Sequence, residues 1–140
     1  MLDSALLARK LKLAAEYLTT LGSIFSGHTD QEIMADFLKY HTAERLFQLI
    51  VDELIDINIH LIRAYEIVPP NDFESTFITL GEHGTFPKDF ALKIAPVVGL
   101  RNLVVHRYEF LQRSKFISDL RKNLSDFKEF FVYIAKLLDK

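Results

Sequence analysis

The chain has 140 residues, 49% of them hydrophobic, and a formal net charge of −2. That length and apolar content predict a single domain over residues 1–140 with a buried core and exclude a disordered chain. There is no cysteine, which excludes disulfides, thiolate metal sites and a cysteine nucleophile. The first residues do not resemble a signal peptide, and no apolar stretch is long enough to cross a membrane. We therefore expect a cytoplasmic protein without a membrane partner.

The charge is distributed unevenly along the chain. Residues 101–140 carry nine Lys and Arg against five Asp and Glu, whereas residues 1–100 carry eight against fourteen. One basic face is what binding to a polyanion requires. A basic last helix that is merely solvated explains the same asymmetry equally well.

The first half of the chain predicts two amphipathic helices. Apolar residues recur in alternating steps of four and three over residues 7–25, which is typical of one buried helical stripe. Thr29 and Glu32 form a capping-box pattern that predicts the start of a second helix. This helix is expected to continue up to the two prolines at 69–70, which forbid its continuation, with a possible bend at residues 40–42 where the pattern shifts.

The second half predicts a short helix and two longer ones. Asn71 is placed to open the short helix and Gly81 to end it. Pro87 suits the first turn of the next helix, in which Pro96 predicts a kink. The last helix, residues 117–138, has the most regular apolar stripe. The expected architecture is all-α: an up-and-down bundle of four main helices plus one short helix.

A polar motif interrupts the apolar run before that last helix, with the sequence Arg-Asn-Leu-Val-Val-His-Arg-Tyr from Arg101 to Tyr108. His106 titrates near neutral pH, so it can take the proton of an RNA 2′-hydroxyl or give one to the leaving 5′-oxygen. Arg101 can hold the phosphate as negative charge develops on it. Asn102 can bind the phosphate or orient the imidazole. This chemistry suits cleavage of RNA without a metal ion or other cofactor, although an arginine and a histidine on an apolar helix are more often a capped helix end or an interface pair.

The spacing of the motif constrains how its side chains meet. On an ideal helix Arg101 and Tyr108 share a face, whereas His106 lies about 140° around the axis from Arg101. Two arrangements can bring the arginine and the histidine together. The helix can end near His106, or the motif of a two-fold partner can complete the site in a homodimer.

The spacing Arg-x4-His-x-Tyr resembles the signature of the HEPN superfamily, and most of all that of HepT-type toxins paired with a minimal nucleotidyltransferase antitoxin. The order of helices, the long second helix with Glu44, Arg45 and Asp56, and the two prolines at 69–70 look like that family too. The resemblance implies a HEPN-like helical domain, a homodimer with a composite cleft, and ribonuclease activity with Arg101 and His106 as catalytic residues. It also implies neutralisation by the cognate nucleotidyltransferase, with Tyr108 as the residue that receives AMP.

Several other residues are candidates for supporting roles. Three basic residues around the end of the motif can track the RNA backbone, or can be ordinary surface charges: Arg107, Arg113 and Lys115. Asp56 is expected to orient His106 from across the bundle. Asp52, Asp56 and His60 have a spacing compatible with metal ligands, but a solvated helical stripe has the same pattern, and we expect no metal.

An alternative function stays open. The chain can be a non-catalytic helical module that binds a nucleotidyltransferase partner or a nucleotide, with its basic cleft used for recognition only. It lacks a glycine-rich phosphate loop and the Gly-Ser and paired aspartates of a nucleotidyltransferase, so it is not expected to be the AMP-transferring partner. A nucleotidyltransferase gene beside this one would favour the toxin.

Overall fold

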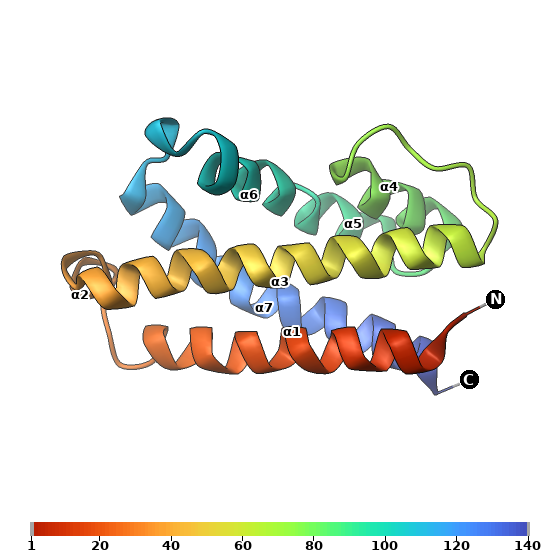
Figure 1. The fold of residues 1–140 in the computed structure, drawn as a ribbon, viewed down its shortest axis with the longest axis horizontal. Helices are drawn as coiled ribbons and strands as arrows, with labels where there is room; N and C mark the ends of the chain where they lie inside the picture. Colours follow the sequence, from red (N-terminus) through yellow and green to blue (C-terminus); the bar gives the residue numbers. More distant parts are fainter. Residues whose placement is uncertain (1, 140) are drawn as a thin grey trace.

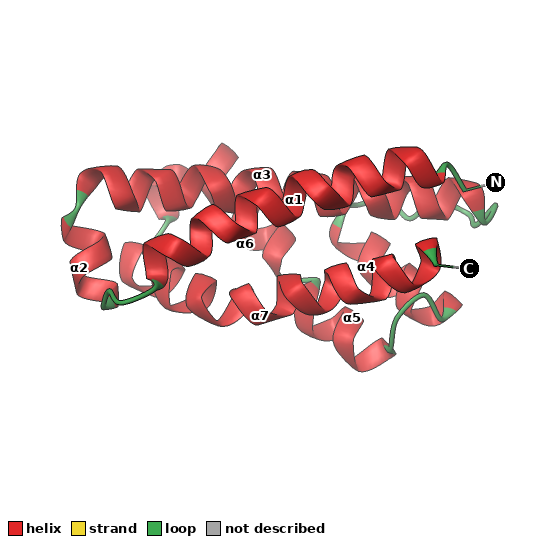
Figure 2. Ribbon diagram, turned by 90° about the horizontal axis from the view of Figure 1, so that it is seen from below, coloured by secondary structure: helices red, strands yellow, loops and turns green. Residues whose placement is uncertain are grey.

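Helix α3 (Phe37–Ala64) is the element against which most of the others pack, in a computed structural model that describes residues 2–139. The remaining helices are α1 (Ser4–Phe25), α2 (Asp30–Ala35), α4 (Glu74–His83), α5 (Lys88–Ile94), α6 (Val97–His106), the 3-10 helix η1 (Tyr108–Phe110) and α7 (Arg113–Leu138). Helix α1 lies along α3 and also contacts α7, while α4 and α6 pack on the other side of α3 (Figure 1). The expected all-α bundle is confirmed, and residues 2–139 contain no strand (Figure 2).

The core contains most residues of the predicted apolar stripes, although Val68, predicted at the end of the second stripe, is 86% exposed. In α1 the stripe residues Leu7, Ala14, Leu18, Leu21 and Phe25 are buried, and in α7 so are Ile117, Leu120, Phe127 and Ile134. Phenylalanine rings join the helices: Phe47 of α3 makes an edge contact with Phe116 of α7, with ring centroids 5.4 Å apart. Within residues 2–139 no helix has the length and apolarity to span a membrane.

The predicted second helix is two helices, and its break lies at Asp36 rather than at residues 40–42. The capping box at the start of α2 is confirmed, since Thr29 Oγ1 accepts the Glu32 N–H at 3.1 Å and Glu32 Oε1 accepts the Thr29 N–H at 2.9 Å. Asp36 has an extended backbone and caps α3, because its Oδ1 accepts the N–H of Lys39 at 3.0 Å. A short polar side chain that bonds nearby backbone N–H groups favours this kind of restart.

Helix α3 also ends earlier than predicted, at Ala64 and not beside the prolines. The N–H of Ile67 bonds the carbonyl of Ile62, and the N–H of Glu66 bonds that of Arg63. Glu66 has a positive φ of 56°. Together these features form a Schellman motif, which ends a helix through backbone bonds of its own. The prolines therefore follow a helix that has already ended.

Two further boundaries differ for identifiable reasons. Helix α4 passes through Gly81 and ends at Gly84, whose φ is 91°. Gly81 is buried against α5, so its small size serves packing and not helix termination. The kink expected at Pro96 is a full break between α5 and α6, which places the motif on a separate short helix.

Candidate active site

Arg101 is held in a fixed orientation by two neighbours. Its Nε donates to Asp52 Oδ1 at 2.9 Å, and its Nη1 donates to Asn102 Oδ1 at 3.0 Å. Asp52 belongs to α3, so this pair connects α6 to the central helix. Within residues 2–139, Nη2 has no hydrogen-bond partner. The guanidinium is therefore orientated and still has donors available for an anionic ligand.

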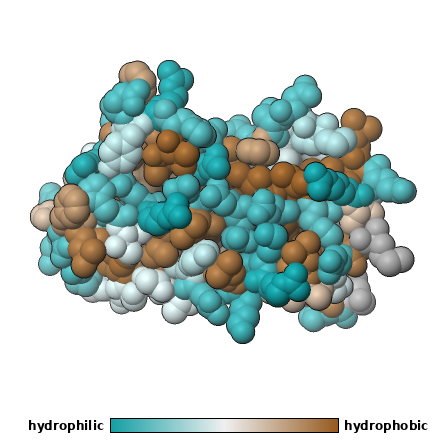
Figure 3. Space-filling model, viewed as in Figure 1, coloured by the Kyte–Doolittle hydropathy of each residue, from teal (hydrophilic) through white to brown (hydrophobic). Residues whose placement is uncertain are grey.

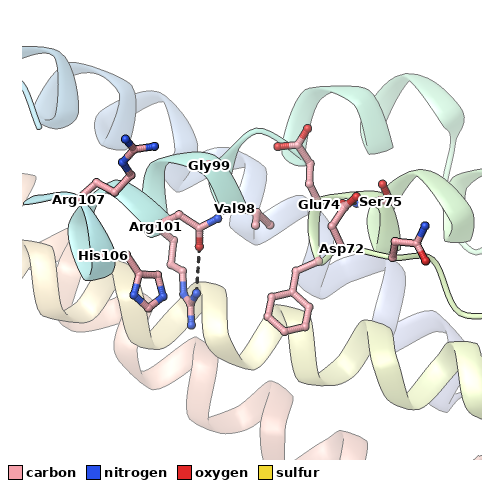
Figure 4. A pocket seen from close by; sticks show the side chains of 11 residues that line it. Asp72, Glu74, Ser75, Val98, Gly99, Arg101, His106 and Arg107 are labelled. Atoms are coloured by element: carbon pink, nitrogen blue, oxygen red, sulfur yellow. Dashed lines mark hydrogen bonds between the residues drawn. The ribbon is translucent and has the colours of Figure 1, made fainter. Parts of the chain in front are cut away.

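His106 is the last residue of α6 and lines the same cavity as Arg101. The helix ends there because Arg107 leaves helical geometry, with φ −138° and ψ 46°. In Figure 4 the side chains of His106 and Arg101 both extend from α6 toward α3, while Arg107 points away. Of the two arrangements that the spacing allowed, the single chain has the one in which the helix ends near His106. The imidazole has no hydrogen-bond partner in the described part of the chain.

The cavity has a volume of about 740 Å³ and two walls of different character. Arg101, Asn102, His106 and Arg107 supply the α6 wall, and residues 71–75 at the start of α4 supply the other (Figure 4). The second wall was missed in the sequence because its residues pattern as a helix start. The N–H of Ser75 donates to Asp72 Oδ1 at 2.8 Å, and this bond holds the pKa of that carboxyl below its usual range. The wall at the start of α4 thus carries the carboxylates Asp72 and Glu74, whereas the α6 wall carries arginine and histidine side chains. An anionic ligand therefore fits the α6 wall.

Tyr108 does not line this cavity and does not share a helical face with Arg101, so that expectation is wrong. The reason is the end of α6 at His106, after which Tyr108 opens η1. Its hydroxyl donates to Glu44 Oε2 of α3 at 2.7 Å. Burial, and then the Glu44 carboxylate, raise the pKa of the phenol.

The structure does not bring Asp56 to His106 as expected. Asp56 is paired with Lys10 of α1 at 3.1 Å, and Asp52, one turn earlier, is the carboxylate that reaches the motif. His60 Nε2 accepts the backbone N–H of Asp3 at 3.0 Å. The three residues with metal-ligand spacing thus have three separate partners, and residues 2–139 hold no cluster of three or more His, Asp or Glu placed to bind a metal.

The three basic residues expected to track RNA lie in different surroundings. Only Arg107 lines the cavity, and its guanidinium also lies 5.2 Å from the ring centre of Phe110. Lys115 is paired with Asp119 one turn along α7 at 2.9 Å. The Arg113 guanidinium lies over the ring of Tyr40, 4.7 Å from its centre, and close enough to Tyr108 to affect its pKa.

An all-α bundle that presents an orientated arginine and an unpaired histidine in one open cavity fits the class of HEPN-type helical nucleases. The family model described as "Ribonuclease HepT-like" matches residues 14–134. The chain therefore belongs to the HepT-like ribonuclease family.

Two similar proteins are nucleases named HepT. The chain is 31% identical to the "tRNA nuclease HepT" of Aphanizomenon flos-aquae over 108 residues, which are 77% of this chain and 73% of the relative. It is 28% identical to the "mRNA nuclease HepT" of Shewanella oneidensis over 76 residues, 54% of this chain and 57% of that one. The tri-AMPylated Shewanella oneidensis HEPN toxin, solved in complex with its MNT antitoxin, has the same fold. Its TM-score is 0.85 at 20% identity, covering 97% of this chain and 99% of the toxin.

Proposed function

We propose that this chain is a metal-independent endoribonuclease that acts as the toxin of a toxin–antitoxin pair. The observation that carries the proposal is the cavity in which Arg101, with free Nη2 donors, and an unpaired His106 meet. Cleavage of RNA without a metal needs two groups from the protein: one that transfers protons near neutral pH, here His106, and a fixed cation that binds the phosphate, here Arg101.

In the proposed reaction the scissile phosphate lies against the α6 wall. Arg101 binds its non-bridging oxygens, and Asp52 keeps the guanidinium in place during the reaction. His106 takes the 2′-hydroxyl proton or protonates the leaving 5′-oxygen. Asn102, which already orients Arg101, completes the phosphate site. Arg107 contributes positive potential at the mouth of the cavity, while Arg113 and Lys115 extend it along α7.

Neutralisation by a nucleotidyltransferase partner is the second part of the proposal, with Tyr108 as the acceptor of AMP. The support is the tri-AMPylated state of the Shewanella toxin solved with its antitoxin, together with the exposure of Tyr108, 39% of whose surface is accessible. Its partner Glu44 precedes Asp52 by two turns of α3, about 12 Å along the axis. An AMP group at Tyr108 would therefore add negative charge about two turns of α3 away from Asp52, the residue that orientates Arg101.

Loss of the two motif side chains tests the catalytic proposal. We expect His106→Ala and Arg101→Ala each to lower RNA cleavage by about 10²–10⁴-fold, because each removes a group that acts on the transition state. EDTA should leave the wild-type rate unchanged. Cleavage can be measured on purified protein with labelled RNA, with Arg45→Ala as a control, since Arg45 is an exposed residue of α3 bonded to Gln48.

Cleavage at the wild-type rate in either motif variant, or a requirement for added metal, would contradict the proposal. Wild-type protein that binds its nucleotidyltransferase but cleaves no RNA would point to the alternative, a non-catalytic binding module.

A further inference from the structure

Glu44 is a buried carboxylate that the cleavage reaction does not use. Its surface is 6% exposed, although it belongs to a helix whose other carboxylates, Asp52, Glu53 and Asp56, are all paired with Arg or Lys. No Lys or Arg of residues 2–139 forms an ion pair with Glu44. Burying an ionisable group in this way costs free energy unless its neighbours compensate.

Two neighbours contact the carboxylate, one at each oxygen. Glu44 Oε2 accepts the hydroxyl proton of Tyr108 at 2.7 Å, and Oε1 lies 2.8 Å from His41 Nδ1. A carboxylate oxygen only accepts, so His41 carries its proton on Nδ1. The His41 ring is itself fixed by contact with Phe37, with ring centres 4.3 Å apart. One oxygen of Glu44 is thus anchored, and the other faces the phenol.

We propose that Glu44 is the general base for nucleotidyl transfer to Tyr108, so that the toxin supplies the proton acceptor for its own modification. The inference rests on the proposed function, in which Tyr108 receives AMP. The phenol oxygen attacks the α-phosphorus of a nucleoside triphosphate, the bond from that phosphorus to the pyrophosphate breaks, and the phenol proton passes to Glu44. A carboxylate that accepts the proton of an attacking hydroxyl has the same role in other phosphoryl-transfer reactions.

The surroundings also explain why Tyr108 would be the acceptor and not its neighbour Tyr40. The Tyr40 side chain is fully buried, and burial, followed by the nearby Glu44 carboxylate, raises the pKa of its phenol. Tyr108 is accessible, and its hydroxyl is bonded to the base. Arg113 lies near both phenols and carries the positive charge that a newly attached phosphate would meet.

The variant Glu44→Gln distinguishes two roles of Glu44: accepting the phenol proton of Tyr108 and holding that phenol in position. The glutamine amide can accept the Tyr108 hydroxyl through its oxygen, and it can donate to His41 Nδ1 once that imidazole carries its proton on Nε2, so the hydrogen bonds are kept while the basicity is lost. The experiment measures initial rates of AMP addition by intact mass, using ATP and the cognate nucleotidyltransferase, for wild type, Glu44→Gln, Glu44→Asp, Tyr108→Phe and Glu53→Gln. Glu53 is the matched control, because it lies on the same helix and pairs with Lys10 at 3.4 Å.

We expect Glu44→Gln to lower kcat for AMP addition by about 10²–10⁴-fold with KM for ATP unchanged, and Glu44→Asp to recover part of the rate. Glu53→Gln should be modified like wild type, Tyr108→Phe should gain nothing, and unmodified Glu44→Gln should still cleave RNA. Wild-type modification rates in Glu44→Gln would overturn the inference alone. A wild type that gains no AMP, or a modified Tyr108→Phe, would overturn the proposed function and this inference with it. Parallel loss of RNA cleavage and of AMP addition in Glu44→Gln would assign Glu44 to the fold instead.

Discussion

At the scale of single residues, the end of α3 depends on a glutamate in a conformation that favours glycine. Glu66 has φ 56° and is exposed, and it holds the position that glycine most often takes in a Schellman motif. A side chain in the left-handed region costs about 1–2 kcal/mol, and glycine avoids most of that cost.

We therefore expect Glu66→Gly to raise the free energy of unfolding by about 1 kcal/mol. The entropy that glycine loses on folding offsets part of the strain that it relieves. Urea denaturation followed by circular dichroism measures the change. Glu16→Gly, at an exposed position inside α1, should do the opposite and destabilise by about 0.5–1 kcal/mol. Equal destabilisation by both changes would show that the left-handed conformation of Glu66 carries no strain.

The active-site pairs are residue-scale features as well. Asp52 was considered in the sequence only as one of three possible metal ligands, yet it is the partner of Arg101. Glu44 entered the sequence analysis only through the family resemblance, and His41 gave no functional signal. Their spacing is that of an ordinary polar helix face. They form a cluster with Tyr108 only because the fold places its hydroxyl against Glu44.

At the scale of helices, α4 and α5 pack so closely that Gly81 has no room for a side chain. A Cβ placed there would lie 2.7 Å from the Cβ of Ala91 and 3.5 Å from the Cα of Lys88. Two carbon atoms do not approach to 2.7 Å without displacing one helix or the other, and Ala91 has no flexible end that could move aside.

Gly81→Ala should therefore destabilise the protein by about 1–2 kcal/mol, because the overpacking cost exceeds the gain in helix propensity. Gly22→Ala is the matched control: Gly22 lies in α1 with nothing within 4 Å of an added Cβ, so the same change should stabilise by up to about 1 kcal/mol. Chemical denaturation of the two variants compares them directly. Stabilisation by Gly81→Ala would mean that α4 and α5 separate easily.

At the scale of the whole molecule, apolar side chains are exposed at the end that carries the motif. Phe37 and Leu38 at the start of α3 are 78% and 75% exposed, and Phe110 of η1 is 60% exposed. Apolar surface is visible at this end of the molecule in Figure 3. Because contiguous exposed apolar surface marks sites of association with another protein, we expect these three side chains to lie in such a site.

We expect a homodimer, in agreement with the interpretation of the motif, and light scattering at micromolar concentration should give twice the 16.2 kDa mass of the chain. Because Arg101 and His106 already line one cavity within a single chain, the dimer would extend the RNA surface and not create the catalytic pair. A monomeric protein that cleaves RNA at full rate would refute the composite cleft and leave the catalytic proposal intact.

Local sequence was sufficient for the helical class and for some of the helix boundaries. The periodic apolar residues predicted the all-α class, Thr29 and Glu32 predicted a helix start, and Pro96 predicted a kink at the place where the structure has a break. Residue types alone were enough to propose phosphate binding by Arg101 and proton transfer by His106. Gly81 was misassigned because helix termination and close packing both select glycine.

Only the tertiary structure decided which groups surround the motif. Arg101 and Asp52 are 49 residues apart in sequence, and Tyr108 and Glu44 are 64 apart. Their pairing depends on how α6 and η1 lie across α3, and a helical repeat carries no information about contacts at such separations. The end of α6 at His106 then directs the imidazole into the cavity and the phenol of Tyr108 toward Glu44, because a chain that leaves helical geometry no longer repeats its side-chain directions every seven residues.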